Sequence, residues 1–398
     1  MLNLRSLLVV VLLFGCAGPP SAPPSIDSAS GTTPPSVAAS NAKSVEPASH
    51  PFDDGPYLFE REGGSIEAVW VRGGEKRART FARGEAVRLP EFRSLLGDSI
   101  SPSSHEPPPC VVPMPVRLFA VTDVEGQYAD LVRMLQGAGV IDTELRWSYG
   151  AGHLVTIGDM VDRGDQVTEV LWLMYRLSRE ALEAGGRVHF VLGNHESMVL
   201  GGDVRYVAKK YDGVCEILGM SYSELLGPDT ELGRWLRVQN SIVRVGELLF
   251  VHAGISPELE VTAETLSEVN DTIRRGLGVP YRDLGRSDPE AAELIRGRHG
   301  PHWYRGFFPR EEPDTLEKYG PRPTEAELDT ILAKLGARTI VVGHTKVRVP
   351  HYLYEGKQVL ALDVPWTRPA EVFGLRIEGE KFELVDIDGS VWGPSPVR

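Results

Sequence analysis

Five short apolar runs in this chain each stop at a residue that can bind a metal ion or transfer a proton, and this repetition constrains the fold more than any other feature. The runs are rich in β-branched residues, which is typical of strands. In a sheet covered by helices, the loops at the strand ends meet at one crevice, so functional residues gather there. We therefore expect five distant segments to converge on one site. The runs are Arg117–Val121, Leu154–Ile157, Val188–Leu192, Leu248–Val251 and Thr339–Val342.

The residues that follow these runs favour a metal centre. Taken singly, a strand-end aspartate is most often a turn or cap residue, and a lone histidine is most often a hydrogen-bonded structural residue. Five such ends in succession change that balance. Carboxylate and amide oxygens combined with imidazole nitrogens suit Mn, Fe or Zn better than Mg or Ca. The candidates, in chain order, are Asp123, Glu125, Asp159, Asp162, Asn194, His195, His252 and His344.

The order of these motifs resembles that of the calcineurin-like metallophosphoesterases, most closely the phosphoprotein phosphatase branch. Gly158–Gly164 (GDMVDRG) and Gly193–Glu196 (GNHE) match that branch in full, and Trp303–Arg305 resembles a segment of the Shewanella-like bacterial phosphatases. The resemblance extends from Val116 to about Thr345. It implies a four-layer sandwich of two mixed β-sheets flanked by helices, whereas the alternation of strand and helix patterns alone predicts only an α/β fold.

The resemblance also implies two divalent cations, and the carboxylate of Glu125 favours Mn or Fe over Zn. They would activate a bridging water as the nucleophile for a phosphate ester. Asp159 is expected to bridge both ions. The first ion is assigned Asp123 and Glu125, and the second is assigned Asn194, His252 and His344.

The roles in proton transfer and phosphate binding follow from the same resemblance. His195 is expected to protonate the departing oxygen, with Asp162 orienting its imidazole. Arg163 is expected to bind the phosphoryl oxygens. Arg305 is the candidate for a second phosphate-binding arginine. Arg296 and Arg298 compete for that role, while the nearby His299 and His302 have no ligand spacing and are interpreted as surface or hydrogen-bonding residues.

Glu125 departs from the family pattern, which usually has histidine at this position. Glutamate still donates oxygen, and the added negative charge favours a harder ion such as Mn or Fe. The alternative is that Glu125 is a turn residue and that the first metal position is weak or empty.

The first residues are predicted to export the protein. Residues 1–15 form a candidate signal peptide, whose apolar run is too short to span a bilayer. The junction Leu13–Cys16 resembles a bacterial lipobox, so Cys16 is the predicted lipidation site of a membrane-anchored lipoprotein on the periplasmic side or the cell surface. An ordinary cleaved signal is the alternative. Residues 16–55, rich in Pro, Ser and Ala, are predicted to form a disordered tether.

Further predictions concern the rest of the chain. Residues 56–112 are predicted to form a small β-subdomain and linker, and 113–398 the catalytic domain. A helix is expected over Val167–Ala184, another after the capping box of Thr324 and Glu327, and a hairpin around Gly379. The sequence leaves open whether Cys110 and Cys215 form a disulfide or are free thiols.

Composition limits the partners. The net charge of −13 argues against nucleic acid, because the summed field repels phosphate backbones. A phosphoprotein or a small phosphoester is the expected substrate. Two alternatives remain: a dinucleoside polyphosphate hydrolase or phosphodiesterase that uses the same site, and a non-catalytic, lipid-anchored binding protein with a degenerate metal site.

Overall fold

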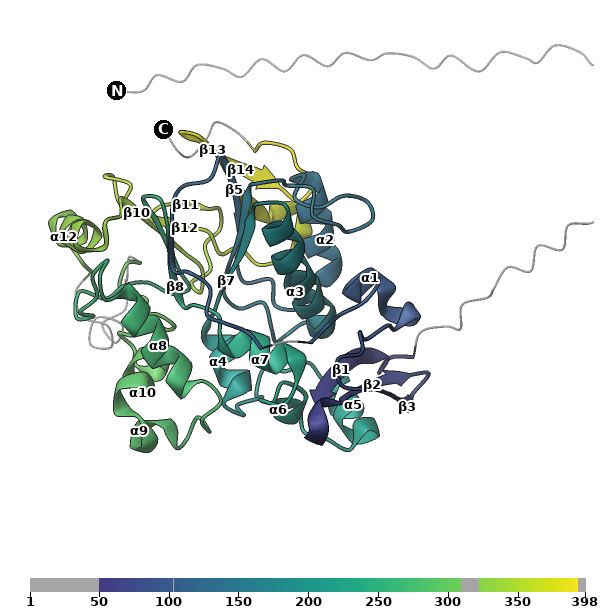
Figure 1. Ribbon diagram of the computed structural model, residues 1–398. Coiled ribbons are helices and arrows are strands. Elements are labelled where there is room, and N and C mark those ends of the chain that lie inside the picture. Colours follow the sequence, from purple (N-terminus) through teal and green to yellow (C-terminus); the bar gives the residue numbers. More distant parts are fainter. Residues whose placement is uncertain (1–49, 103, 309–321, 393–398) are drawn as a thin grey trace, which may run out of the picture. The chain divides into compact units, whose positions relative to one another are not determined.

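The computed structural model describes residues 50–102, 104–308 and 322–392 (Figure 1). The predicted signal peptide, Cys16 and most of the predicted tether lie outside these residues. Within them, no helix combines the length and the apolar character that crossing a bilayer requires.

Two mixed β-sheets form the centre of the fold. The first has five strands in the order β14-β13-β5-β6-β7, in which β5, β6 and β7 are parallel. Its strands are β5 (Arg117–Val121), β6 (His153–Ile157), β7 (Arg187–Val191), β13 (Phe373–Glu378) and β14 (Lys381–Asp386). The second has six strands in the order β11-β12-β10-β9-β8-β4, and its strands are β4 (Val111–Val112), β8 (Ile242–Val245), β9 (Leu248–Val251), β10 (Thr339–Val342), β11 (His351–Tyr352) and β12 (Val359–Ala361).

The two sheets pack face to face, with helices on their outer faces. Alternate residues of a strand point to opposite sides, so Leu118 and Phe250 join a core between the sheets, whereas Phe119 and Leu249 face the helices. Helices α2 (Tyr128–Gly137) and α3 (Val167–Glu183) cover the five-stranded sheet, and α8 (Leu266–Gly276) and α12 (Glu325–Leu335) cover the six-stranded sheet. The predicted four-layer arrangement is confirmed.

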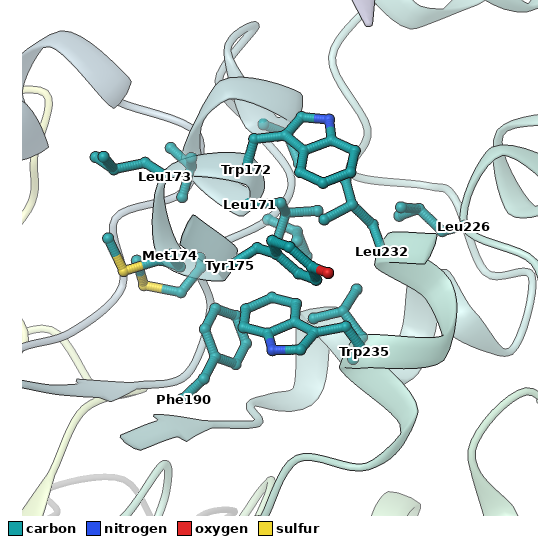
Figure 2. Close-up of a cluster of buried hydrophobic side chains, with 14 of the residues drawn as sticks. Leu171, Trp172, Leu173, Met174, Tyr175, Phe190, Leu226, Leu232 and Trp235 are labelled. Carbon is teal, nitrogen blue, oxygen red and sulfur yellow. The ribbon is translucent and has the colours of Figure 1, made fainter. Parts of the chain in front are cut away.

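An aromatic cluster fixes α3 against the five-stranded sheet (Figure 2). The ring of Trp235 on α7 (Glu231–Arg237) lies 4.9 Å from that of Phe190 and 5.8 Å from that of Tyr175. Such edge-to-face pairs each contribute about 0.5–1.5 kcal/mol beyond the burial of their area. The Tyr175 hydroxyl donates to the buried Glu231 carboxylate at 2.7 Å, so the cluster leaves no phenol unpaired there.

The remaining helices connect or flank these layers. They are α1 (Arg93–Leu96), α4 (Asn194–Leu200), α5 (Lys210–Leu218), α6 (Tyr222–Leu225), α9 (Leu284–Ser287) and α10 (Pro289–Arg296). In the part of the chain that the structure describes, three short 3-10 turns are η1 (Glu62–Gly64), η2 (Pro90–Phe92) and η3 (Pro369–Glu371).

The N-terminal β extension is an antiparallel sheet of β1 (Asp54–Glu60), β2 (Ile66–Arg72) and β3 (Glu75–Phe81). It is anchored to the main fold by Asp54, which accepts from Tyr57 at 2.6 Å and Thr168 at 2.7 Å and pairs with Lys210 at 2.6 Å. Strand β1 therefore begins inside the range predicted for the tether, and β4 begins just before the predicted start of the catalytic domain.

The local predictions around the sheets agree with the structure. The capping box at Thr324 begins α12, and Gly336 ends it with φ 61° in the left-handed region. Helix α3 spans the predicted range to within a residue, and β13 and β14 form the predicted hairpin, in which Gly379 has φ 58°. These features are set by neighbouring residues, which explains why the sequence reveals them.

Candidate metal centre

Asp159, His252 and His344 come together at the ends of three strands from both sheets. Their candidate ligand atoms all lie within 4.8 Å of one another, and all three residues are buried. His252 Nε2 is 3.2 Å from Asp159 Oδ2 and 3.1 Å from His344 Nδ1. The tertiary structure thus joins residues separated by 185 positions along the chain (344 − 159).

Asn194 adds a fourth predicted ligand to this group. It is the first residue of α4, and its Oδ1 lies 3.0 Å from His252 Nε2. On the other side of the His252 ring, Nδ1 is 2.8 Å from the carbonyl oxygen of Ile157. A carbonyl can only accept, so Nδ1 carries a proton and Nε2 faces the group, as in ligating histidines.

The electrostatics of this group fit a cation. Burial alone raises the pKa of Asp159, but His252 and His195 outweigh it and hold that pKa well below its usual range. Burial also disfavours the charged form of His252, yet Asp159 raises its pKa to about 10. Burial, His252 and Arg305 keep the pKa of His344 well below its usual range. A buried carboxylate, an amide oxygen and two imidazoles form a donor set typical of divalent transition metals.

Asp123 lies beside this group at the end of β5. Its Oδ2 accepts from Thr122 Oγ1 at 2.5 Å and from the backbone N–H of His344 at 3.1 Å. Burial raises the pKa of Asp123 to about 7, although His252 opposes that shift. The carboxylate is therefore held against the loop that carries His344.

Glu125 faces cationic side chains. Its Oε1 contacts Arg163 Nη1, and Lys346 Nζ is 3.7 Å from the same oxygen. Glu125 is not in the group of atoms within 4.8 Å of one another. The contact couples the predicted phosphate-binding arginine to the predicted metal-binding glutamate.

His195 and Asp162 form a buried pair next to Asp159. His195 Nδ1 lies 2.6 Å from Asp162 Oδ2, and Nε2 lies 3.6 Å from Asp159 Oδ2. Burial lowers the pKa of His195, but Asp159 and Asp162 outweigh that effect and raise it. The imidazole is thus oriented, is favoured as a cation, and directs Nε2 toward the metal ligands.

Arg305, and not Arg296, lies at this centre. Arg305 Nη1 donates to the carbonyl of His344 at 3.1 Å and to Thr345 Oγ1 at 2.9 Å. Arg296 stacks over the ring of Tyr281 at 4.6 Å and lines a separate cavity of about 850 Å³, which none of the predicted ligands lines. Arg298 is exposed.

The loops at this centre carry most of the strained backbone. Among the described residues, eight other than glycine have a positive φ, and six of them are predicted site residues. Such conformations cost about 1–3 kcal/mol each and persist at functional sites because the surroundings impose them. The six are Asp123, Glu125, Asp159, Asp162, Arg163 and His344.

Glycines next to the ligands permit close approach. A Cβ atom at Gly193 would overlap the Asp159 carboxylate, and one at Gly343 would overlap Asp123 and Thr122. This explains physically why Asn194 and His344 each follow a glycine.

Glu196 joins two of the loops. Its buried carboxylate accepts from the backbone N–H groups of Asp159 at 3.0 Å, Met160 at 2.7 Å and Gly193 at 2.7 Å. Glu196 therefore fixes the position of Asp159 relative to Asn194 through the backbone.

Three residues at the site were not predicted from the sequence: Tyr206, Lys346 and Asp363. The ring centroid of Tyr206 lies 5.1 Å from that of His195, and its carbonyl accepts from the Arg163 N–H at 2.9 Å. Asp363 follows the apolar run Val359–Leu362, so the strand-end signal used for the other five runs could have found it. Tyr206 and Lys346 lie in loops and have no comparable signal.

His299 and His302 each form a hydrogen bond with a serine. His302 Nε2 lies 2.8 Å from Ser241 Oγ, and burial lowers the pKa of His302 to about 3. His299 Nδ1 lies 3.1 Å from Ser256 Oγ, so both histidines have the hydrogen-bonding roles predicted.

Cys110 and Cys215 are free thiols, which answers the disulfide question that the sequence left open.

Comparison with known proteins identifies the family. The family model described as calcineurin-like phosphoesterase matches residues 116–348. The cold-active protein-tyrosine phosphatase of a psychrophilic Shewanella species superposes with a TM-score of 0.74 at 35% identity, covering 85% of this chain and 98% of that one.

Two curated relatives match over shorter stretches. Shewanella-like protein phosphatase 2 of Arabidopsis thaliana is 28% identical over an alignment of 275 residues, and the match covers 58% of this chain and 66% of that protein. The symmetrical bis(5'-nucleosyl)-tetraphosphatase of Neisseria meningitidis is 29% identical over 160 residues, 40% of this chain and 51% of that protein. The chain thus spans about two thirds or less of the length of these two relatives. With the fold and the strand-end site described above, the match shows that this chain belongs to the calcineurin-like phosphoesterase family.

Proposed function

We propose that this protein is a metal-dependent phosphomonoesterase that acts on phosphoproteins. The observation that carries the proposal is the position of the buried Asp162–His195 pair directly beside Asp159 and its imidazole neighbours. A protein that only binds metal needs neither an oriented proton donor nor an adjacent arginine. The same pair argues against the alternative of a non-catalytic binding protein.

One group of residues would hold the metal ions. Asp159, Asn194, His252 and His344 would hold divalent cations, with Asp123 on the side of the first. Bound there, such cations would lower the pKa of a water molecule. They would also place positive charge beside the phosphoryl oxygens.

The proton and the phosphoryl group are handled by other side chains. His195 donates its proton to the departing ester oxygen, and Asp162 keeps the ring oriented and charged for this step. Arg163 and Arg305 lie far apart along the chain, and both present their guanidinium groups to the phosphoryl oxygens. Only Nη1 of Arg163 contacts Glu125, so the remaining N–H groups of the guanidinium can bind the phosphoryl oxygens.

We further propose that the preferred leaving group is aromatic. Tyr206 is 42% exposed, and its ring lies beside His195 and 5.5 Å from the Arg163 guanidinium carbon. An exposed ring beside the proton donor can pack against a phenol leaving group. The relative from Shewanella is named a protein-tyrosine phosphatase, which agrees with this choice.

A substrate panel tests the function. Purified protein in Mn²⁺ is incubated with a phosphotyrosine peptide, a phosphoserine peptide, p-nitrophenyl phosphate and a dinucleoside tetraphosphate, and phosphate release is measured. We expect the phosphotyrosine peptide to give the highest kcat/KM. Preference for the dinucleotide would support the activity named for the Neisseria relative instead. Metal binding without hydrolysis of any of the four would support a binding protein.

We propose Mn or Fe as the metals, because Glu125 adds a carboxylate where the family usually has imidazole. Glu125→His is expected to raise the ratio of activity with Zn²⁺ to activity with Mn²⁺, since an imidazole suits zinc better. The ratio is measured on metal-free protein reloaded with each ion. An unchanged ratio would show that Glu125 does not bind the metal and instead serves only Arg163 and Lys346.

We also propose that the protein is exported and lipid-anchored through Cys16. The support is the sequence of the first sixteen residues alone. Expression in a bacterium with radiolabelled palmitate tests it. Label in the wild type that Cys16→Ser abolishes would support the anchor, whereas an unlabelled, secreted wild type would favour an ordinary cleaved signal.

A further inference from the structure

Asp363 lies at the metal centre, but none of the roles assigned above involves it. It follows β12, which runs parallel to β10 with Ala361 beside Val342. Two residues further, this register brings Asp363 alongside His344. Backbone hydrogen bonds from Leu362 to Val342 and from Val347 to Asp363, both 2.9 Å, hold the two loops together.

The other side of this segment is tied to the loop that carries Asp123. The indole N–H of Trp366 donates to the carbonyl of Thr122 at 2.8 Å, and Trp366 is buried. Asp363 is thus held between the His344 loop and the Asp123 loop.

The carboxylate of Asp363 is buried and unpaired. The residue is 1% exposed, and neither oxygen has a hydrogen-bond partner among the described residues. Buried charged groups in proteins are almost always paired, hydrogen-bonded or bound to a metal. Two free buried oxygens on one side chain therefore indicate a ligand.

The charges around Asp363 point to a cation as that ligand. Asp123 Oδ2 accepts from the backbone N–H of His344 at 3.1 Å, so Asp123 and Asp363 both lie against the loop that carries His344. Lys346 is half-exposed and pairs with Glu125. Buried carboxylates that lie against one loop need a compensating positive charge, and a divalent ion supplies it most directly.

We propose that Asp363 is a ligand of the first divalent cation, together with Asp123, at the position where Glu125 replaces the usual histidine. The inference rests on the metal-dependent function proposed above and adds a ligand to it. The first site then consists of carboxylates, which are hard donors and select Mn or Fe over Zn. The carboxylate of Asp363, which follows β12, compensates for the missing imidazole.

Metal binding by Asp363→Asn tests the assignment without reference to activity. Metal-free wild type and variant are titrated with Mn²⁺ by calorimetry, and bound Mn is counted by elemental analysis after gel filtration. We expect two Mn per chain in the wild type and about one in Asp363→Asn, or a second Mn that binds at least ~10-fold more weakly, as losing a residue that supports the metal does.

Melting curves separate a lost ligand from a lost fold. In chelator, Asp363→Asn should melt at or above the wild-type temperature, because the substitution removes an unpaired buried carboxyl. Added Mn²⁺ should raise its melting temperature less than that of the wild type. Asp54→Asn is the matched control: this buried aspartate is held by Tyr57, Thr168 and Lys210, so its loss should lower stability and leave two Mn bound.

Two outcomes would overturn the proposal, and they differ. Two Mn bound by Asp363→Asn with wild-type affinity would show that Asp363 is a structural carboxyl, and the metal-dependent function would stand. A wild type that binds no Mn would remove the proposed function as well. If Asp363→Asn fails to fold in chelator, Asp363→Ser is titrated in its place, with the same expected loss of one Mn.

Discussion

His195→Asn is expected to lower kcat at least ~10²-fold while the metal content stays as in the wild type. Asparagine retains a polar amide near the position of Nδ1, but it cannot give a proton to the departing oxygen. The 2.6 Å contact with Asp162 and the approach of Nε2 to Asp159 place the lost proton where the reaction needs it. The measurement is kcat on the phosphotyrosine peptide, with bound Mn counted in the same preparation.

The leaving group provides the internal test of this prediction. A substrate with an acidic leaving group, such as p-nitrophenyl phosphate, needs less help from an acid. The substitution should therefore lower kcat less on this substrate than on the peptide. His299→Asn is the matched control, because His299 lies against Ser256 and carries no role in the site. Equal, small losses in both variants would remove His195 from the mechanism.

Asp159→Asn is expected to lose both metals and at least ~10³-fold in kcat/KM, because the metal effects that depend on it amount to several kcal/mol. Asp159 is the carboxylate toward which His252, His195 and the rest of the group are directed. Its neutral isostere keeps the shape and removes the charge that attracts the cations. Elemental analysis and kcat/KM with saturating Mn²⁺ measure the two losses.

Chelation of the wild type should reproduce this result, and added Mn²⁺ should reverse it in the wild type but not in Asp159→Asn. A melting temperature of the variant close to that of the chelated wild type would show that the fold survives. Two Mn retained by Asp159→Asn at full activity would contradict the assignment of Asp159 as the shared ligand.

Much of the candidate site was predictable because its residues follow strands. The apolar runs that end at Val121, Ile157, Val251 and Val342 are strands β5, β6, β9 and β10. A strand and the turn that ends it are encoded within about ten neighbouring residues, so their pattern is visible in the sequence. The same locality explains the helix that begins at Thr324.

Other contacts could not be predicted from the sequence. The salt bridge between Arg163 and Glu125 joins two loops, and each residue has the same neighbours in sequence whether or not the contact forms. Four backbone N–H groups converge on Glu196 only because β6 and β7 are parallel neighbours. Tyr206 reaches His195 from a loop without periodicity.

The sequence by itself determined the family, the strand ends and the types of side chain that stand there, because these depend on local patterns and on motif order. The tertiary structure decided which ends meet: it places β6 in one sheet, β9 and β10 in the other, and brings Asp159 to His252 and His344. It also placed the unpaired Asp363 beside the loop that carries His344. The physical reason is that a strand's partner is chosen by packing over the whole domain, and no short segment carries that information.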